Sequence, residues 1–386
     1  MIPYGHQDIT QADVDAVVAA LTSDYLTQGP LVPRFERAVA GYCGAAHGVA
    51  VNSGTSALHV ACMALGLGPG DWLWTSPITF VASANCALYC GARADFVDID
   101  PRTWNLSADA LKSKLATAAA TGRLPKVVVP VHFGGQSCDM QAIHALAHQY
   151  GFKVIEDASH ALGGSYLGQP IGNCRFSDIA ILSFHPVKTI TTAEGGMALT
   201  NDAALADRMA RLRSHGITRN PAEMTHVPDG PWYYQQIELG YNYRMTDLHA
   251  ALGLSQVQRL DAYVDRRHAI ANRYDAELAG LPFTLPERLA DCRSGLHLYV
   301  IRLQLQRMHR THREVFDSLR EQGIGVNLHY IPVHLQPWYA RMGFMPGDFP
   351  EAERYYAEAI SLPIFPALTD AQQARVVAGL TIAVGR

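Results

Sequence analysis

The sequence predicts an α/β fold with a large domain built on a mainly parallel sheet and a smaller C-terminal α+β domain. Up to about residue 200, continuous apolar strands alternate with amphipathic helices, a pattern typical of a parallel sheet covered on both faces. After about residue 246 this alternation stops. The chain has 386 residues, which is too long for one ordinary core. We therefore divide it into residues 1–250 and residues 251–386.

Capping residues and apolar spacing predict the elements of the first domain. Thr10 is suited to cap a helix that reaches Leu21, and Ser53 a helix over 55–65 that ends in the glycine-rich turn 66–70. Further helices are expected over 79–89, after the capping residue Ser107, and over 141–150. Strands are expected over 94–99, 126–131, 152–155, 179–184 and 196–200.

The second domain is predicted from a looser pattern. Residues 246–278 favour one long helix, with or without a break. A strand over 298–303, a helix over 313–322, a strand over 326–329 and two late helices follow. Residues 221–231 are expected to form a mobile loop.

Composition excludes several classes of protein. Hydrophobic residues make up 48% and charged residues 17% of the chain, which argues against a disordered protein. The net charge of −4 gives no basic footprint for nucleic acid, and no apolar run approaches the roughly 20 residues of a membrane span. We expect a cytoplasmic protein, because the start lacks a secretory signal and the seven cysteines contain no CxxC pair. No histidine or cysteine spacing indicates a metal site.

Lys188 is the first candidate for chemistry. It is one of only five lysines and lies between the strand predicted over 179–184 and a glycine pair at 195–196. That position is the carboxyl end of a strand, where ligand sites of α/β folds gather. A solvated lysine in a surface loop is the ordinary alternative.

Three other features of the sequence become informative when they are considered together with this lysine. Asp157 ends an apolar strand, Gly54 and Thr55 stand at a helix N-terminus, and Phe80 follows a predicted strand end. Alone, each has an ordinary explanation as a helix cap or core residue. Together they match the needs of pyridoxal phosphate (PLP), which requires a lysine for its aldehyde, a carboxylate for its ring nitrogen, a phosphate cradle and a flat face.

Several longer motifs show a resemblance to a known family. Residues 183–188 (SFHPVK) and 192–196 (TAEGG) resemble the lysine motif of the DegT/DnrJ/EryC1/StrS sugar aminotransferases. The resemblance covers essentially the whole chain and includes 26–29 (LTQG), 156–160 (EDASH), 240–247 (GYNYRMTD) and 361–363 (SLP). It implies a PLP-dependent transferase of fold type I. The family's dehydratases carry histidine in place of the lysine, so Lys188 favours transamination.

The resemblance also implies roles for individual residues. Lys188 would bond to the cofactor aldehyde, Asp157 would pair with the ring nitrogen, and His160 would lie near the ring face or the 3-hydroxyl. The phosphate would be held by Ser183, Gly54 and Thr55, and by Asn242 of a neighbouring subunit, which implies a homodimer with shared sites. The sugar-nucleotide site would be lined by Tyr4, Leu26, Thr27, His329 and Tyr330.

Four segments resemble one subgroup, the aminotransferases of pseudaminic acid biosynthesis. They are 2–5 (IPYG), 75–85 (TSPITFVASAN), 214–217 (SHGI) and 329–332 (HYIP). The likeness implies transfer of an amino group from L-glutamate to C4 of UDP-4-keto-6-deoxy-N-acetyl-β-L-altrosamine. Transamination of another 4-keto or 3-keto nucleotide sugar is the alternative. A catalytically silent protein of the same fold is a further alternative, which the presence of Lys188, Asp157 and Ser183 disfavours.

Overall fold

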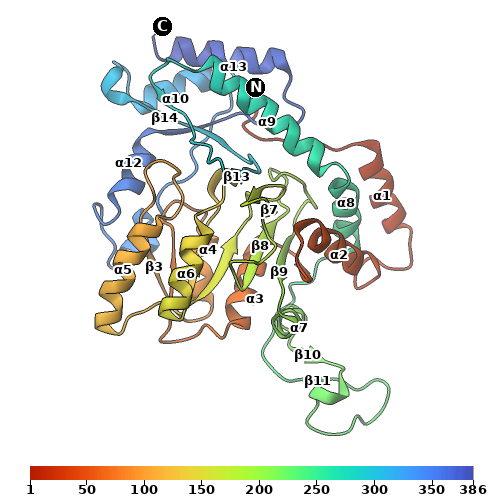
Figure 1. The fold of residues 1–386 in the computed structure, drawn as a ribbon. Coiled ribbons are helices and arrows are strands. Elements are labelled where there is room, and N and C mark those ends of the chain that lie inside the picture. The colour runs from red at the N-terminus through yellow and green to blue at the C-terminus, as the bar shows by residue number, and fades with distance from the viewer. Residues whose placement is uncertain (386) are drawn as a thin grey trace.

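A computed structural model describes residues 1–385 (Figure 1). Its central sheet has seven strands. The strand order is β1-β9-β8-β5-β4-β2-β3. Strands β8, β5, β4, β2 and β3 pair in parallel, whereas β9 runs antiparallel to both of its neighbours, β1 and β8. The mainly parallel sheet is therefore confirmed. Its strands are β1 (His47–Val51), β2 (Trp72–Thr75), β3 (Arg93–Phe96), β4 (Val127–Val129), β5 (Lys153–Asp157), β8 (Ile179–Ser183) and β9 (Gly196–Thr200).

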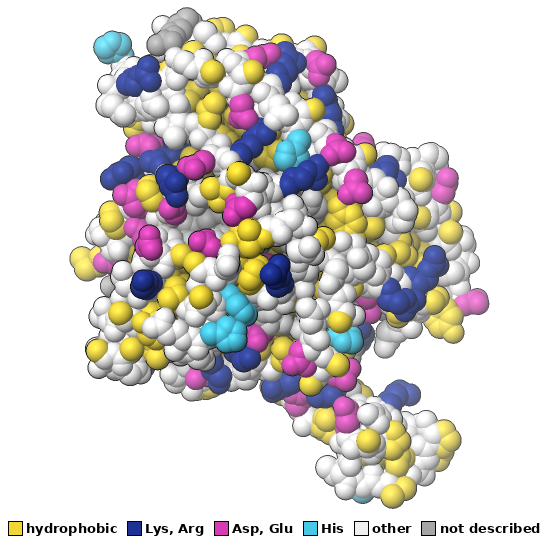
Figure 2. All heavy atoms as spheres, viewed as in Figure 1, with side chains coloured by type: hydrophobic (Ala, Val, Ile, Leu, Met, Phe, Trp, Pro, Cys, Tyr) yellow, Lys and Arg dark blue, Asp and Glu magenta, His cyan; other side chains and the backbone are white. Residues whose placement is uncertain are grey.

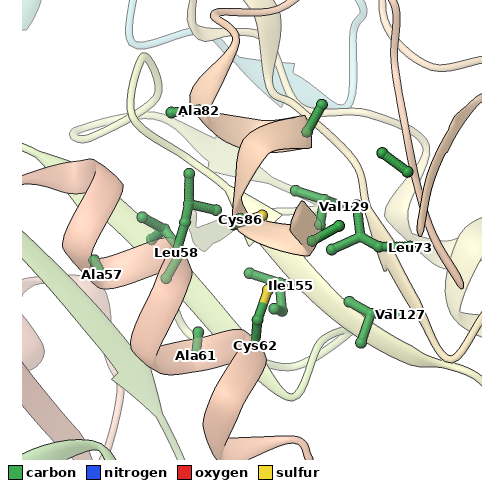
Figure 3. Close-up of a cluster of buried hydrophobic side chains, with 14 of the residues drawn as sticks. Ala57, Leu58, Ala61, Cys62, Leu73, Ala82, Cys86, Val127, Val129 and Ile155 are labelled. Carbon is green, nitrogen blue, oxygen red and sulfur yellow. The ribbon is translucent and has the colours of Figure 1, made fainter. Parts of the chain in front are cut away.

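Helices cover both faces of this sheet. Successive side chains of a strand point to opposite faces, so each face contributes to a separate core. Val127 and Val129 of β4 belong to a core shared with α3, α4 and α7. Val128, between them, belongs to a second core shared with α2, α5 and α6. Figure 3 shows part of the first core, with Leu58 of α3 near Cys86 of α4. These helices are α2 (Leu31–Cys43), α3 (Gly54–Ala64), α4 (Ala82–Tyr89), α5 (Ala108–Thr121), α6 (Met140–Tyr150) and α7 (Ala203–Leu212).

The predicted caps are present. Thr10 is the N-cap of α1 (Gln11–Leu21), and Ser53 and Ser107 accept backbone hydrogen bonds at the starts of α3 and α5. Each cap satisfies a backbone N–H group that has no partner within its helix. At the start of α3 the cap fixes the backbone from which the Gly54 and Thr55 N–H groups project.

The part of the chain that begins at Asp247, here called the second region, contains a small antiparallel sheet (Figure 1). It has its own core. The long helix predicted over 246–278 is broken at Gln258 and Arg259. None of the helices within residues 1–385 has both the length and the apolar content to cross a membrane. The elements are α8 (Asp247–Val257), α9 (Leu260–Glu277), β12 (Phe283–Thr284), β14 (Tyr299–Leu303), α10 (His312–Glu321), α11 (Pro337–Ala340), α12 (Pro350–Glu358), β15 (Ala359–Leu362) and α13 (Asp370–Ala383). Because Ile2 also packs into this core, the division at residue 250 stays a prediction.

Some boundaries differ from those predicted. The strand expected over 326–329 is wrong, because only Asn327 pairs there, through a single bridge to Ser361. The helix expected to start at residue 79 starts at Ala82, since residues 76–80 form an irregular turn stabilised by the Ser76 hydroxyl. No element was predicted at the positions of α2, β1 and β2, which lie between the predicted capping residues Thr10, Ser53 and Ser107.

The remaining strands form two small sheets. A small sheet in the order β13-β6-β7 lies beside the second region and consists of β13 (Cys292–Arg293), β6 (Ser165–Tyr166) and β7 (Gln169–Pro170). Strands β10 (Ile217–Thr218) and β11 (Gln235–Gln236) bound a segment that projects away from the body (Figures 1 and 2). We call residues 217–236 the arm. The arm contains the loop predicted over 221–231, and its mobility stays a prediction.

Candidate active site

A cavity of about 540 Å³ opens at the carboxyl ends of β5 and β8. This is the edge at which a parallel sheet binds its ligands. We call Gly54, Asp157, Ser183 and Lys188 the floor of the cavity, and His297, Asn327, His329 and Tyr330 its wall. Most of the predicted site residues line the cavity: Tyr4, Gly54, Thr55, Phe80, Asp157, His160, Ser183, Lys188, His329 and Tyr330.

Lys188 lies in the floor, in the loop that follows β8. Its backbone N–H donates to the carbonyl of His185 at 2.9 Å, which closes a tight turn. Burial lowers the pKa of its ammonium to about 8, although the negative charge of Asp157 opposes this shift. About one amine in ten is therefore neutral at pH 7 and able to act as a nucleophile or base.

Asp157 is the last residue of β5 and is 6% exposed. Its Oδ2 accepts a hydrogen bond from the Ser83 hydroxyl at 2.6 Å, and its Oδ1 accepts one from the Ser159 N–H at 3.1 Å. Ser83 is in turn hydrogen-bonded to Thr79 at 2.7 Å. These contacts fix the orientation of a carboxylate that has no direct ion pair with an arginine or lysine among residues 1–385. The carboxylate can therefore pair with a cationic ligand.

The start of α3 faces the end of β8 across a narrow gap beside the cavity. A Cβ atom at Gly54 would lie 3.1 Å from the Cβ and 3.3 Å from the Oγ of Ser183. Glycine therefore lets the helix N-terminus approach the end of β8 closely. Free N–H groups and the helix dipole favour an anion at this point. The hydroxyls of Thr55 and Ser183 are also part of the cavity lining.

His160 is neutral and has a defined tautomer. The Gly134 N–H donates to its Nδ1 at 3.3 Å, so the ring proton lies on Nε2. Nε2 lies 3.2 Å from the Tyr330 hydroxyl, to which it therefore donates. Burial, aided by the positive charge of Lys188, lowers the pKa of His160 well below its usual value. Because the Tyr330 oxygen accepts this bond, its O–H group is free to donate to a ligand.

Aromatic side chains line the remaining part of the cavity. Phe80 is 58% exposed and its ring centroid lies 6.3 Å from that of Tyr330, so a flat face is available for stacking. The ring of Tyr4 lies 5.2 Å from that of His329. The Nδ1 of His329 lies 2.8 Å from the Ser361 hydroxyl, and burial lowers the pKa of this imidazole to about 3.

Three predicted residues do not line the cavity. Leu26 and Thr27 lie on the surface, where Thr27 forms a bridge with Thr246. Asn242 is also exposed and forms a bridge with Ser214 near the base of the arm. One chain therefore does not bring these three side chains together with Lys188, and their roles stay predictions.

The sequence analysis missed several residues of the cavity. Ser83, which holds Asp157, lies in a helix whose pattern indicates only packing. His297 and Asn327 come from irregular segments of the second region. His297 precedes the strand that was predicted over 298–303, but no local motif marks it. No arginine lines the cavity, and Lys188 is the only lysine in its lining within the described part of the chain.

Comparisons with known proteins agree with this geometry. The chain is 41% identical over 372 residues to the spore coat polysaccharide biosynthesis protein SpsC of Bacillus subtilis, covering 96% of this chain and 93% of that protein. It is 38% identical over 366 residues to a UDP-4-amino-4,6-dideoxy-N-acetyl-β-L-altrosamine transaminase of Campylobacter jejuni, covering 94% and 92%. The solved structure of Helicobacter pylori PseC, an aminotransferase of pseudaminic acid biosynthesis, superimposes with a TM-score of 0.90 at 29% identity and 99% coverage of both chains.

A family model also matches residues 7–381, which is nearly the whole chain. Enzymes of this family depend on PLP, and the floor residues fit that group. A buried lysine, an oriented carboxylate and a glycine-limited cradle at a helix N-terminus lie in one cavity. From the family match and this constellation, the chain belongs to the DegT/DnrJ/EryC1/StrS aminotransferase family and is a PLP-dependent sugar aminotransferase.

Proposed function

We propose that the protein transfers an amino group from L-glutamate to C4 of UDP-4-keto-6-deoxy-N-acetyl-β-L-altrosamine, a step of pseudaminic acid biosynthesis. The observation that carries the proposal is the placement of Lys188 and Asp157 in one cavity with Tyr4, His329 and Tyr330. The relative from C. jejuni is named for the altrosamine product, and the neighbour from H. pylori is named for pseudaminic acid biosynthesis. These names support the proposed substrate, whereas the residues of the cavity support the proposed reaction.

The residues of the floor would divide the work of transamination. PLP, when bound, supplies an electron sink for the bond that breaks at the donor Cα. Asp157 would pair with the protonated pyridine nitrogen of that ring and keep the ring cationic. Lys188 would hold the cofactor and then, as a free amine with a lowered pKa, would move the proton away from Cα. In the second half of the reaction Lys188 would return a proton to the sugar carbon, which predicts ping-pong kinetics.

The wall residues would orient the sugar. His329 has its proton on Nδ1, because Asn327 donates to its Nε2 at 3.4 Å. The Tyr330 hydroxyl remains able to donate, since it accepts from His160. Because His329 uses both ring nitrogens on Ser361 and Asn327, the Tyr330 O–H is the donor that suits a keto or hydroxyl oxygen of the substrate.

A second substrate class is favoured by one specific comparison. The relative from B. subtilis is named for spore coat polysaccharide biosynthesis and is more identical to this chain than the altrosamine transaminase. This supports the alternative that the acceptor is another 4-keto or 3-keto nucleotide sugar. In both cases the donor, the cofactor and the floor residues are the same.

We also propose a homodimer in which Asn242 of one subunit reaches the phosphate in the other. Asn242, Leu26 and Thr27 lie on the surface, outside the cavity of their own chain. The arm and its flank expose large apolar side chains, with Val227 84%, Trp232 73% and Leu239 71% accessible. Apolar side chains that project from the body (Figure 2) are typical of an interface. A nucleotide diphosphate also needs cations, and the cavity of one chain holds only Lys188.

A direct assay tests the substrate. The holoenzyme is incubated with L-glutamate and the 4-keto altrosamine nucleotide, and the product is followed by mass spectrometry and NMR. We expect a product with an amino group at C4 and one equivalent of 2-oxoglutarate. Faster conversion of a different 4-keto or 3-keto nucleotide sugar under the same conditions would replace the proposed acceptor with the alternative.

Sedimentation tests the assembly. The wild-type chain should sediment as a dimer, and Trp232→Glu should shift it toward the monomer and weaken PLP retention. Lys112→Glu, on the outer face of α5, serves as a charge control. A wild-type monomer that retains full activity would rule out shared sites.

A further inference from the structure

His297 forms part of the cavity wall but has no partner for one of its nitrogens. The side chain is only 4% exposed, and its ring centroid lies 4.5 Å from that of His160. Its Nδ1 is buried and forms no hydrogen bond within residues 1–385. Buried polar atoms in folded proteins nearly always have a partner. The ring also lines the cavity, and its other nitrogen, Nε2, is not enclosed and forms no hydrogen bond within the described residues, so Nε2 is the atom available to a ligand.

The backbone around His297 is held firmly. The Gly295 N–H donates to the Gly135 carbonyl at 2.9 Å, and the Leu298 N–H donates to the Gly134 carbonyl at 3.2 Å. Gly135 has a φ of 110°, and a Cβ there would lie 2.6 Å from the backbone nitrogen of Leu296. Only glycine permits this approach. Because Gly134 also donates to His160, one turn positions both imidazoles.

Behind His297 lies a buried arginine without a counter-charge. Arg267 of α9 is 1% exposed. Its Nη1 donates to three backbone carbonyls, those of Leu296 at 3.2 Å, His297 at 3.3 Å and Ile364 at 2.9 Å. Within the described part of the chain no carboxylate forms an ion pair with it, and its Nε has no partner. Burial of an unpaired charge is costly, so its retention beside the cavity calls for a function.

This charge makes the wall attractive to anions. Burial lowers the pKa of Arg267 to about 10, so the side chain is still charged at neutral pH. In a low-dielectric interior its field reaches the adjacent wall with little screening. Burial, with the positive charges of Lys188 and Arg267 adding to the effect, lowers the pKa of His297 well below its usual value. His297 is therefore a neutral imidazole that can donate one hydrogen bond.

We propose that His297 binds the side-chain carboxylate of a dicarboxylic amino donor, and that Arg267 positions His297 and supplies the favourable field. The inference rests on the proposed function, in that the donor is an amino acid that enters this cavity. It explains how a cavity without an arginine in its lining binds a second carboxylate. A donor with a neutral side chain, such as alanine, gains nothing from this arrangement.

Calorimetry of the holoenzyme with glutarate tests the binding role, because glutarate carries both carboxylates but cannot react. His297→Phe should raise the Kd for glutarate about tenfold, as expected for loss of one hydrogen bond to a charged group. The Kd for UDP, which reports the nucleotide site, should change less than twofold. His334→Phe is the matched control: it is as buried and has an unpartnered Nδ1, but lies outside the cavity.

Three results would overturn the binding role. They are an unchanged Kd for glutarate in His297→Phe, an equal weakening of glutarate and UDP, or a wild-type protein that binds glutarate no better than butyrate. A wrong acceptor sugar leaves the glutarate measurement untouched, so failure of the proposed substrate is distinguishable from failure of this inference.

A pair of variants at Arg267 separates positioning by charge from simple packing. Arg267→Met removes the charge and keeps the volume, and should weaken glutarate binding as much as His297→Phe does. Arg267→Lys keeps the charge and should recover most of that affinity. Equal glutarate affinities in the two variants, or wild-type affinity in Arg267→Met, would contradict a role for the field.

Discussion

The floor and the wall of the cavity are built in different ways. The floor residues Gly54, Asp157, Ser183 and Lys188 stand at the ends of regular elements or directly after them, where a rigid sheet fixes their positions. The wall residues come from irregular segments of the second region. The floor carries the groups that PLP chemistry needs, whereas the wall faces the rest of the cavity, where the substrates would lie. Rigid strand ends thus suit covalent chemistry, and irregular segments suit recognition.

The largest effect is expected at Lys188. Lys188→Ala removes the amine that carries the cofactor and moves protons, so transamination should fall at least about 10²–10⁴-fold from loss of proton transfer alone. Borohydride reduction followed by peptide mapping should label residue 188 in the wild type and nothing in the variant. Lys126→Ala, which alters a surface lysine paired with Asp71, is the control and should stay active. Label at any other lysine would refute the role given to the floor.

Asp157→Asn should have the next largest effect. The amide keeps the size of the side chain and can still accept from Ser83, but it no longer stabilises a proton on a ring nitrogen. Loss of such a fixed charge typically costs about 10²–10³-fold in kcat. Single-turnover absorbance measurements with glutamate would show a slow first half-reaction with the cofactor still bound. A normal rate in this variant would mean that the floor carboxylate does not face the cofactor ring.

Gly54 tests the size of the phosphate cradle. Gly54→Val places branched atoms against Ser183, where even a Cβ would be 3.1 Å away. Overpacking of about 1–3 kcal/mol should weaken PLP binding by about fivefold to 150-fold. Gly54→Ala needs a shift of only a few tenths of an ångström and should bind PLP nearly as well as the wild type. Equal loss in both variants would show that chain flexibility, and not space, is what glycine provides.

The pH dependence of cofactor uptake reports the environment of Lys188. A pKa of about 8 leaves about one amine in ten neutral at pH 7, and bond formation with an aldehyde requires the neutral form. Because the pKa is lowered, the association rate of apoprotein with PLP should rise about tenfold per pH unit up to about pH 8 and then level off. Stopped-flow absorbance measures this rate. A rise that continues to pH 10 would mean that burial does not lower the pKa of this lysine.

The same contrast explains what could be predicted from the sequence. Lys188 and Asp157 follow apolar strands, and Gly54 follows a capping serine, so local patterns place all three at one sheet edge. His297 has no such pattern, because contacts with the distant turn at Gly134 and Gly135 and with Arg267 of α9 bring it to the cavity. The strand wrongly predicted over 326–329 has a related cause. Its apolar residues satisfy the strand pattern, but the segment pairs only at Asn327 and then turns into the cavity.

The smallest effect is expected at Tyr330, and it tests whether a wall residue serves only substrate binding. Tyr330→Phe removes the hydroxyl that accepts from His160 at 3.2 Å and leaves the ring in place. One hydrogen bond contributes about 1 kcal/mol, so KM for the sugar nucleotide should rise about fivefold. The first half-reaction with glutamate should be unaffected if Tyr330 serves only the acceptor. His160→Gln, measured in parallel, retains an acceptor and a donor in the side chain and should show a smaller rise in KM. If Tyr330→Phe instead slows the glutamate half-reaction and leaves KM for the sugar nucleotide unchanged, the Tyr330 hydroxyl takes part in the chemistry assigned to the floor.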